Sequence, residues 1–313
     1  MPLESIVVGD ENLFDVLVIG GGIAGLTACI FCAKANFKVG FIEKNVPGGK
    51  LVEIKKITNY PGFESISGPD LALKLYEQAT NIGAKYILGE VKLIDKKDRY
   101  HAIYTSDGVN RFAKAIIIAS GTIEEQLKAK GIEKYINSGV SYCATCDGNL
   151  AKNKKIMITG NNYAKIIDSI NYLNNLSSSI YVVCFDENFD FSEFKNNKRI
   201  IIKSGWKVEE IFGNDEKMTS VSINKNNEIE KIPTEFIFIC NNMISATSFI
   251  NEKKIICNST NIVINDYNKS TDVKGIFAAG DVARTNHKLL VTAASDGAVA
   301  ALSAIKYIQK EWK

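Results

Sequence analysis

Two cysteines three residues apart, Cys143 and Cys146, form the most specific chemical pattern in the chain, within Ser-Tyr-Cys-Ala-Thr-Cys-Asp-Gly at 141–148. Cysteines at this spacing can close a small disulfide ring that cycles readily, and a helix N-terminus would make one thiolate reactive. Asp147 follows directly and can exchange a proton with the leaving thiol. The pattern predicts a redox-active pair, because a zinc half-site would need a second, suitably placed cysteine pair.

A second Cys-x-x-Cys, formed by Cys29 and Cys32, lies within the helix that we expect over 23–35. Positions three apart share one helix face, and small apolar side chains are needed there for packing. We therefore interpret these two cysteines as core residues. Seven cysteines would be unusual for a disulfide-stabilised secreted protein of this size, so we expect thiols in a reducing compartment.

Three glycines, Gly20, Gly22 and Gly25, form Gly-x-Gly-x-x-Gly at a predicted strand-to-helix turn. The first permits the tight turn, the second lets a pyrophosphate approach the backbone, and the third lets helix and strand pack closely. The helix N-terminus adds N–H groups and a partial positive charge. Glu43, at the end of the next predicted strand, can accept hydrogen bonds from a ribose diol and would repel a 2′-phosphate. The pattern predicts FAD or NAD at this site, and not NADP.

A second candidate flavin motif lies near the C-terminal end, where an apolar strand expected over 273–279 leads into Gly280 and Asp281. Its sequence, Gly-Ile-Phe-Ala-Ala-Gly-Asp, looks like the second FAD motif of flavoprotein disulfide reductases, whose aspartate binds the ribityl chain. A buried strand that ends in an exposed turn would explain this segment alone, but not two such motifs in this order. The two motifs together therefore favour FAD over NAD.

Strands and helices alternate along the chain. Apolar runs are typical of buried parallel strands, and they predict strands at 14–19, 38–42, 115–119, 156–159, 180–185, 236–240 and 273–279. Helix-forming segments lie at 23–35, 70–82, 164–173 and 293–308. This order predicts an α/β fold with two Rossmann-like, doubly wound domains.

The composition is that of a globular protein, with 46% hydrophobic residues, 23% charged residues and a net charge of +3. No apolar run reaches the roughly 18 residues of a membrane span, and the N-terminus lacks the pattern of a signal peptide. The small charge fits neither a nucleic-acid-binding stripe nor a polybasic membrane anchor. No Cys/His spacing resembles a metal site. We expect a cytoplasmic protein without a bound metal.

Together these motifs resemble those of the low-molecular-weight thioredoxin reductases, over essentially the whole chain. Pro-Gly-Gly-Lys at 47–50 and Thr-Asn-Tyr-Pro-Gly-Phe at 58–63 look like the flavin-contacting loops of that family. The resemblance therefore adds Gly49, Lys50 and Asn59 to the candidate FAD-binding residues.

The resemblance also implies roles and partners. Cys146 would lie nearest the flavin, Cys143 would attack the disulfide of thioredoxin, and Asp147 would act as the acid. The family further implies a homodimer.

The family's domain arrangement implies a discontinuous FAD domain, 1–117 with 249–313, and an inserted redox-disulfide domain, 118–248. The inserted domain should bind NADPH, but its glycine-rich turn departs from the family's Gly-Gly-Gly pattern. Only Gly160 remains, and Asn162 carries a side chain into the space that a pyrophosphate would use. The inserted domain is thus expected to be a degenerate NADPH-binding fold.

Further departures remove contacts that would hold NADPH. Asn161 replaces another glycine, and Lys165 replaces the small residue at which helix and strand pack. Where the family places His-Arg-Arg for the 2′-phosphate, this chain has Cys184, Phe185 and Asp186. Losing two charge-assisted hydrogen bonds costs roughly 3–6 kcal/mol, which is about 10²–10⁴ in affinity.

Segments 240–245 and 288–290 also differ from the family's motifs, the second at a position beside the flavin. We therefore hypothesise a thioredoxin reductase that takes electrons from reduced ferredoxin. Such an enzyme would resemble the ferredoxin-dependent flavin thioredoxin reductases, which keep FAD and Cys-x-x-Cys but lack the NADPH motifs. Two alternatives stay open: an NADPH-dependent thioredoxin reductase with a divergent nucleotide site, and a flavin-bound redox sensor without turnover.

Overall fold

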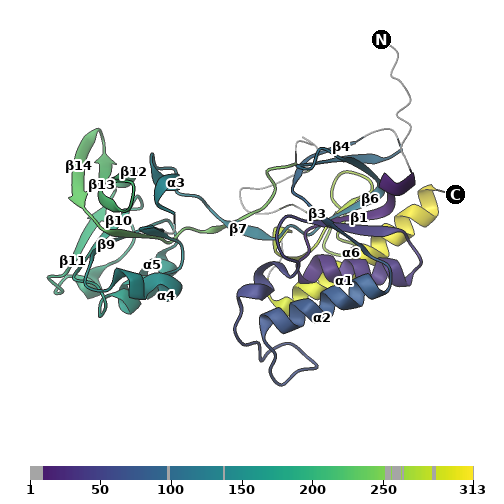
Figure 1. Ribbon diagram of the computed structural model, residues 1–313, viewed down its shortest axis with the longest axis horizontal. Helices are drawn as coiled ribbons and strands as arrows, with labels where there is room; N and C mark the ends of the chain where they lie inside the picture. The colour runs from purple at the N-terminus through teal and green to yellow at the C-terminus, as the bar shows by residue number, and fades with distance from the viewer. Residues whose placement is uncertain are drawn as a thin grey trace, which may run out of the picture. The chain divides into compact units, whose positions relative to one another are not determined.

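The chain folds into two compact units, the second of which interrupts the first (Figure 1). The computed structural model describes residues 10–96, 99–136, 138–250, 255, 262, 264–283 and 287–312. The first unit comprises residues 1–123 and 244–313, and the second comprises residues 124–243. The second unit begins and ends a few residues within the range 118–248 that the sequence predicts for the inserted domain.

The first unit is built on a seven-stranded sheet in the order β3-β2-β1-β6-β5-β4, with β17 also paired to β6. Its strands are β1 (Leu13–Ile19), β2 (Val39–Glu43), β3 (Lys85–Leu88), β4 (Val91–Lys96), β5 (His101–Thr105), β6 (Asn110–Ile118) and β17 (Ile276–Ala278). The strands β3, β2, β1, β6 and β17 pair in parallel, whereas β4, β5 and β6 pair antiparallel. The parallel strands are rich in valine and isoleucine because both of their faces are buried.

Three helices lie together beside this sheet: α1 (Ile23–Lys34), α2 (Gly68–Asn81) and α6 (Leu290–Glu311) (Figure 1). α1 is buried over most of its surface, because it shares one hydrophobic core with the sheet, α2 and α6. Gly297 of α6 permits the close contact with α1, since a Cβ at this position would lie 2.1 Å from the carbonyl oxygen of Ala24. Short 3-10 helices at Asp10–Asn12 (η1), Gly49–Glu53 (η2) and Gly280–Val282 (η5) complete the unit.

The second unit has a five-stranded parallel sheet in the order β11-β10-β9-β15-β8 and a separate three-stranded antiparallel sheet, β12-β13-β14. The strands are β8 (Val140–Ser141), β9 (Lys155–Thr159), β10 (Ser179–Cys184), β11 (Ile200–Ser204), β12 (Lys207–Gly213), β13 (Met218–Lys225), β14 (Glu228–Pro233) and β15 (Phe236–Ile239). The helices are α3 (Ile132–Tyr135), α4 (Ala144–Asp147), α5 (Tyr163–Leu173), η3 (Gly148–Ala151) and η4 (Ser192–Phe194). Two short strands, β7 (Thr122–Glu124) and β16 (Met243–Ser245), pair where the chain passes between the units.

Side chains of β9 show how the second unit is layered. Ile156 and Ile158 belong to one hydrophobic core with α5, whereas Met157 belongs to another with the three-stranded sheet. Successive residues of a strand point to opposite faces, so the parallel sheet has α5 on one side and the antiparallel sheet on the other. The expected α/β fold with two Rossmann-like domains is confirmed.

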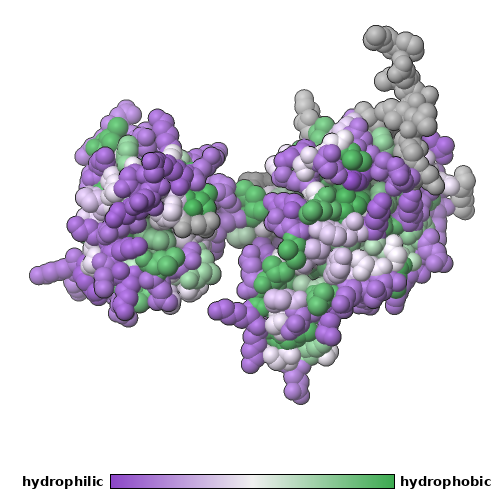
Figure 2. Space-filling model, viewed as in Figure 1, coloured by the Kyte–Doolittle hydropathy of each residue, from purple (hydrophilic) through white to green (hydrophobic). Residues whose placement is uncertain are grey.

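One predicted strand is shorter than expected. The apolar run at 273–279 forms a strand only over β17, because the chain turns at Gly275, which has φ +82. Figure 2 shows hydrophilic side chains over much of the visible face of each unit. Within the described part of the chain, no helix has the length and apolar character needed to cross a bilayer.

Candidate functional site

The first glycine loop follows β1 and leads into α1. Gly20 has φ +104, and a Cβ there would lie 2.3 Å from the carbonyl oxygen of Ala119. A Cβ at Gly25 would lie 1.9 Å from the carbonyl oxygen of Gly20, so the helix packs directly on the turn. A Cβ at Gly22 would instead meet nothing within 4 Å, and no side chain caps this end of α1 in the described residues. The first N–H groups of α1 are therefore available to a phosphate group.

Glu43 ends β2 beside this loop. Its Oε2 accepts a hydrogen bond of 2.8 Å from the N–H of Gly21, and its Oε1 accepts one of 2.9 Å from the N–H of Asn45. These bonds fix the carboxylate and still leave each oxygen a lone pair for a ribose hydroxyl. A cavity of about 120 Å³ adjoins the loop, and Gly20, Glu43 and Phe249 are among the residues that line it.

The loop at 47–50 packs against the first glycine loop, since the N–H of Gly48 donates to the carbonyl oxygen of Gly21 at 2.8 Å. Lys50 Nζ donates a hydrogen bond to Thr122 Oγ1 and lies 3.8 Å from Asp281 Oδ2. The structure thus brings together Lys50 and Asp281, which come from motifs at opposite ends of the chain. The sequence did not identify Thr122, because no motif marks it.

Three other candidate FAD-binding residues differ in their surroundings. A Cβ at Gly49, which has φ +54, would lie 3.2 Å from Gly22 Cα. Gly280 has φ +74 and begins η5 shortly after β17. Asn59 is exposed on the segment between the bridged residues Ile57 and Ile66.

The two cysteines of the predicted redox pair lie in the second unit. Cys143 and Cys146 are joined by a disulfide, with their Cα atoms 5.3 Å apart. Cys143 is the N-cap of α4, where its Sγ accepts a hydrogen bond of 3.1 Å from the N–H of Cys146. Asp147 is half-buried, and its Oδ2 accepts a hydrogen bond of 2.6 Å from Ser141 Oγ. Ser141 stands in the quoted motif, but the motif alone gave no sign of this contact.

The second Cys-x-x-Cys is buried in α1, as free thiols. Burial raises the pKa of Cys29 well above its usual range and raises the pKa of Cys32 to about 12. A thiol that does not ionise is a poor nucleophile, which agrees with the interpretation of both residues as part of the core.

The glycine loop of the second unit is filled by its own side chains. Asn162 is the N-cap of α5, and its Oδ1 accepts a hydrogen bond of 3.1 Å from the N–H of Lys165. Lys165 Nζ lies 3.0 Å from Glu124 Oε1 and 3.2 Å from the carbonyl oxygen of Asn241. The N-terminal turn of α5 is thus capped by a side chain, whereas that of α1 is not.

The side chain of Asn161 hydrogen-bonds the same loop to two segments that are distant in the sequence. Its Nδ2 donates to Glu125 Oε2 at 2.8 Å, and its Oδ1 accepts from the N–H of Asn242 at 2.7 Å. Gly160 keeps the tight turn, with φ +155 and a Cβ position only 2.1 Å from the carbonyl oxygen of Cys240. The tight turn of a Rossmann fold is therefore retained, but the side chains of Asn161 and Asn162 make hydrogen bonds around it.

An aromatic and an acidic side chain follow the end of β10, where the family's pattern places cations for a 2′-phosphate. The ring of Phe185 is 63% exposed, and Lys207 Nζ lies 3.9 Å from its centroid. Asp186 Oδ1 accepts a hydrogen bond of 2.9 Å from the N–H of Asn188.

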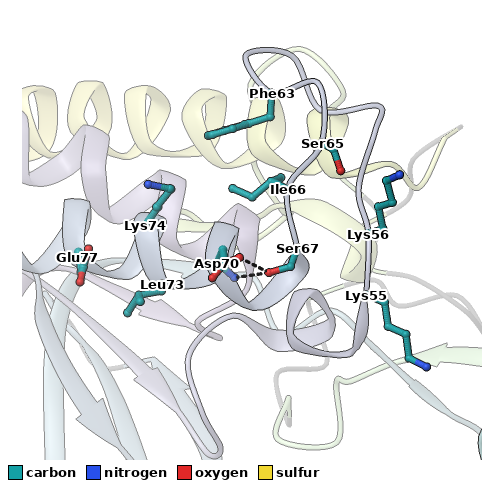
Figure 3. Close-up of a pocket in the computed structure, with 10 residues that line it drawn as sticks. All are labelled: Lys55, Lys56, Phe63, Ser65, Ile66, Ser67, Asp70, Leu73, Lys74 and Glu77. Atoms are coloured by element: carbon teal, nitrogen blue, oxygen red, sulfur yellow. Dashed lines mark hydrogen bonds between the residues drawn. The ribbon is translucent and has the colours of Figure 1, made fainter.

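A separate pocket of about 580 Å³ lies in the first unit, between the segment 55–67 and α2 (Figure 3). Its lining includes Lys55, Phe63 and Asp70. Phe63 ends the predicted flavin-contacting loop at 58–63, but none of the individually predicted FAD-binding or redox residues lines the pocket. Figure 3 shows Ser67 and Asp70 joined by hydrogen bonds. Ser67 caps the start of α2, because its Oγ accepts a hydrogen bond from the N–H of Asp70. We therefore assign this pocket no part in the redox chemistry.

Comparison with known proteins matches these features. The model of the pyridine nucleotide-disulphide oxidoreductase family matches residues 14–297. The thioredoxin reductase of Listeria innocua is 33% identical over 311 residues, which is 96% of each chain. That of Helicobacter pylori is 34% identical over 310 residues, 95% of this chain and 99% of the relative. The chain belongs to the thioredoxin reductase family.

Solved structures of this family are similar as well. The thioredoxin reductase of Lactococcus lactis is 31% identical, with a TM-score of 0.73, over 95% of this chain and 99% of the other. A ferredoxin-flavin thioredoxin reductase of Clostridium acetobutylicum is 28% identical, with a TM-score of 0.55, over 95% of this chain and 98% of the other.

As a thioredoxin reductase family member, the chain is a flavoprotein disulfide oxidoreductase with FAD as its cofactor. The first unit fits this cofactor. The uncapped start of α1 at Gly22 suits a pyrophosphate, the fixed carboxylate of Glu43 suits a ribose, and the cavity beside them is bounded by the same loop.

Proposed function

We propose that this flavoprotein reduces thioredoxin through Cys143 and Cys146, and that it takes its electrons from reduced ferredoxin and not from NADPH. FAD, when bound, accepts electrons singly and passes them on as a pair, which suits a one-electron donor and a disulfide acceptor. Gly22 with the start of α1, Glu43 and Asp281 would hold it.

The donor assignment is carried by the hydrogen bond from the N–H of Lys165 to Asn162 Oδ1. In a Rossmann fold the pyrophosphate of a dinucleotide lies at the helix N-terminus and uses its free N–H groups. Here a side chain already uses one of them. Glu124, 3.0 Å from Lys165 Nζ, also places a carboxylate beside the loop. A pyrophosphate would have to displace the Asn162 cap, and it would compete with Glu124 for Lys165.

Side chains also occupy the space next to β10. The ring centroid of Tyr163 lies 5.1 Å from that of Phe189 and 5.9 Å from that of Phe191. The Tyr163 hydroxyl donates a hydrogen bond of 2.5 Å to the carbonyl oxygen of Asp190. Together with the carboxylate of Asp186, this cluster leaves an unfavourable site for the adenosine 2′-phosphate of NADPH.

Reduced ferredoxin is a suitable donor on energetic grounds. Plant-type ferredoxins lie near about −400 mV and thioredoxin near about −270 mV. The difference of roughly 130 mV corresponds to about 6 kcal/mol for two electrons. A ferredoxin-flavin thioredoxin reductase is among the similar solved structures, with a TM-score of 0.55 against 0.73 for the thioredoxin reductase of Lactococcus lactis.

The proposed disulfide chemistry uses three side chains. Two electrons and two protons convert the Cys143–Cys146 disulfide into two thiols. The thiolate of Cys143 attacks the thioredoxin disulfide and forms a mixed disulfide, and Asp147 supplies the proton to the sulfur that leaves. Cys146 then attacks Cys143 Sγ, which re-forms the disulfide and releases thioredoxin as a dithiol.

An NADPH-dependent reaction is the alternative that one observation favours. Lys207 lies over Phe185 at the end of β10 and offers a cation near the position where the 2′-phosphate would bind. If this cation compensates for the missing arginines, NADPH will support turnover at micromolar concentration. A redox sensor would instead show no turnover with any donor.

Anaerobic steady-state assays with thioredoxin separate these functions. We expect turnover with reduced ferredoxin, no turnover with NADPH or NADH above the rate without donor, and none with the Cys143→Ser variant. Turnover with NADPH alone would overturn the donor assignment. Absence of turnover with every donor, in protein that retains FAD, would favour the sensor.

A further inference from the structure

Ser141 ends the edge strand β8, two residues before Cys143. It pairs with Phe238 of β15 across the parallel sheet, and only 5% of the residue is exposed. A buried hydroxyl needs hydrogen-bond partners, and those of Ser141 all lie in the redox motif.

The contacts of Ser141 connect two parts of this motif. Its Oγ accepts a hydrogen bond of 3.0 Å from the N–H of Cys143 and lies 2.6 Å from Asp147 Oδ2. The carbonyl oxygen of Cys143 is a second acceptor, at 3.3 Å. A hydroxyl has one hydrogen to donate, and the shorter contact to a carboxylate is the stronger one. The N–H of Cys143 therefore orients the hydroxyl so that its hydrogen points at Asp147.

We infer that Ser141 is a positioning residue that holds Asp147 for proton transfer to the redox pair. This inference rests on the proposed roles of Cys143, Cys146 and Asp147. Because Oδ2 is bound to Ser141, the other oxygen of the carboxyl group is left to exchange a proton with sulfur. Because Ser141 is fixed in β8, its hydrogen bond connects Asp147 to the parallel sheet as well as to the short helix α4.

The proton balance shows why this position matters. When the two thiols of Cys143 and Cys146 reduce a thioredoxin disulfide, one disulfide forms and one breaks, and two protons pass to the thioredoxin sulfurs. A carboxyl group that rotates freely would meet the leaving sulfur only part of the time.

A purely structural role for Ser141 makes a different prediction. If the hydroxyl only satisfies the buried N–H of Cys143, its loss will destabilise the second unit and leave the kcat of the folded protein unchanged. It will also act independently of Asp147.

Variants at 141 and 147 distinguish these roles in anaerobic thioredoxin turnover with FAD-loaded protein and dithionite-reduced methyl viologen as donor. For Ser141→Ala we expect kcat to fall about tenfold, since general acid catalysis contributes 10²–10⁴-fold in all, with the KM for thioredoxin unchanged. In the Asp147→Asn background, Ser141→Ala should have no further effect on kcat.

Ser141→Thr and Ser141→Val form a matched pair, because the two side chains have the same shape and differ in the hydroxyl. The threonine variant should keep the kcat of the unchanged protein, and the valine variant should behave like the alanine variant. This pair gives the test if the alanine variant does not fold. Losses of kcat that multiply in the double variant, or an unchanged kcat in the valine variant, would overturn the inference. Full activity of Cys143→Ser or Cys146→Ser would instead refute the proposed function on which it rests.

Discussion

Asn162 Oδ1 accepts a hydrogen bond from the backbone N–H of Lys165, at the start of α5 in the second unit. At the equivalent place in the first unit, α1 begins at Gly22 without any such cap in the described residues. The two Rossmann-like domains therefore differ at the helix start where the pyrophosphate of a dinucleotide would bind. One has the free helix terminus that a dinucleotide needs, and the other has closed it with its own side chain.

Asn162→Ala should lower the free energy of unfolding by about 1 kcal/mol, because an N-cap side chain contributes that much to a helix. Thioredoxin reduction with a non-nucleotide donor should change little, since the cap has no part in it. Chemical denaturation measures the first effect and steady-state turnover the second. Asn175→Ala, at an exposed turn position of the same unit, is the control that should leave stability unchanged. Loss of turnover without loss of stability would show that the loop has a catalytic part.

Cys143→Ser and Cys146→Ser should each abolish thioredoxin reduction while FAD stays bound. Cys29→Ala and Cys32→Ala should retain turnover and lose about 1 kcal/mol of stability, because a buried side chain is shortened. Turnover and flavin absorbance of the four purified variants check this. Inactive but folded Cys29 and Cys32 variants would contradict the assignment of the redox chemistry to Cys143 and Cys146.

Asp281→Ala should weaken FAD binding about tenfold or more, because a charge-assisted hydrogen bond to a ribityl hydroxyl contributes about 1.5–3 kcal/mol. The same change also leaves Lys50 without the carboxylate that lies 3.8 Å from its Nζ. Recovery of flavin fluorescence on dilution measures the dissociation constant. Asp266→Ala, an exposed acidic residue of the same unit, should bind FAD like the unchanged protein, and equal affinity in the two variants would remove Asp281 from the site.

His101 should make the first unit sensitive to acid. Burial, with a smaller contribution from Lys96, lowers the pKa of His101 from 6.5 to about 4, and its Nδ1 has no hydrogen-bond partner among the residues that the structure describes. The folded state therefore binds the proton less readily than the unfolded state. Stability is fully present above pH 6.5 and is lost as the pH falls towards 4, by up to about 3 kcal/mol.

Urea unfolding at a series of pH values with saturating FAD tests this dependence. His101→Gln should flatten the dependence between pH 6.5 and 4, whatever its effect on stability at neutral pH. His287 is exposed, so His287→Gln should keep the slope. An unchanged slope in the His101 variant would assign the acid sensitivity to other groups.

Local patterns in the sequence predict much of this fold. The apolar runs of β1 and β2, the glycines between them and Glu43 all belong to one βαβ unit. Their order along the chain therefore determines that they lie close together. The Cys143–Cys146 disulfide could be predicted for the same reason, because its partners lie within one turn.

Contacts between distant segments could not be predicted in this way. Lys165 was expected to disturb helix packing, but its partner Glu124 is 41 residues away in sequence. Thr122 meets Lys50 only because the chain between β6 and β7 passes beside the loop at 47–50. Such contacts depend on sheet order and on the path of the connections, for which single residues give no pattern.

Rapid anaerobic mixing of the FAD-loaded protein with reduced ferredoxin, NADPH or NADH, followed by flavin absorbance, identifies the electron donor. We expect ferredoxin to bleach the flavin band at a rate that falls with ionic strength, because ferredoxins are acidic proteins and docking would use lysine side chains. NADPH and NADH at millimolar concentration should bleach it no faster than buffer, since Asn162, Lys165 and Asp186 occupy or oppose the dinucleotide site. Fast bleaching by NADPH that saturates at micromolar concentration would contradict this account.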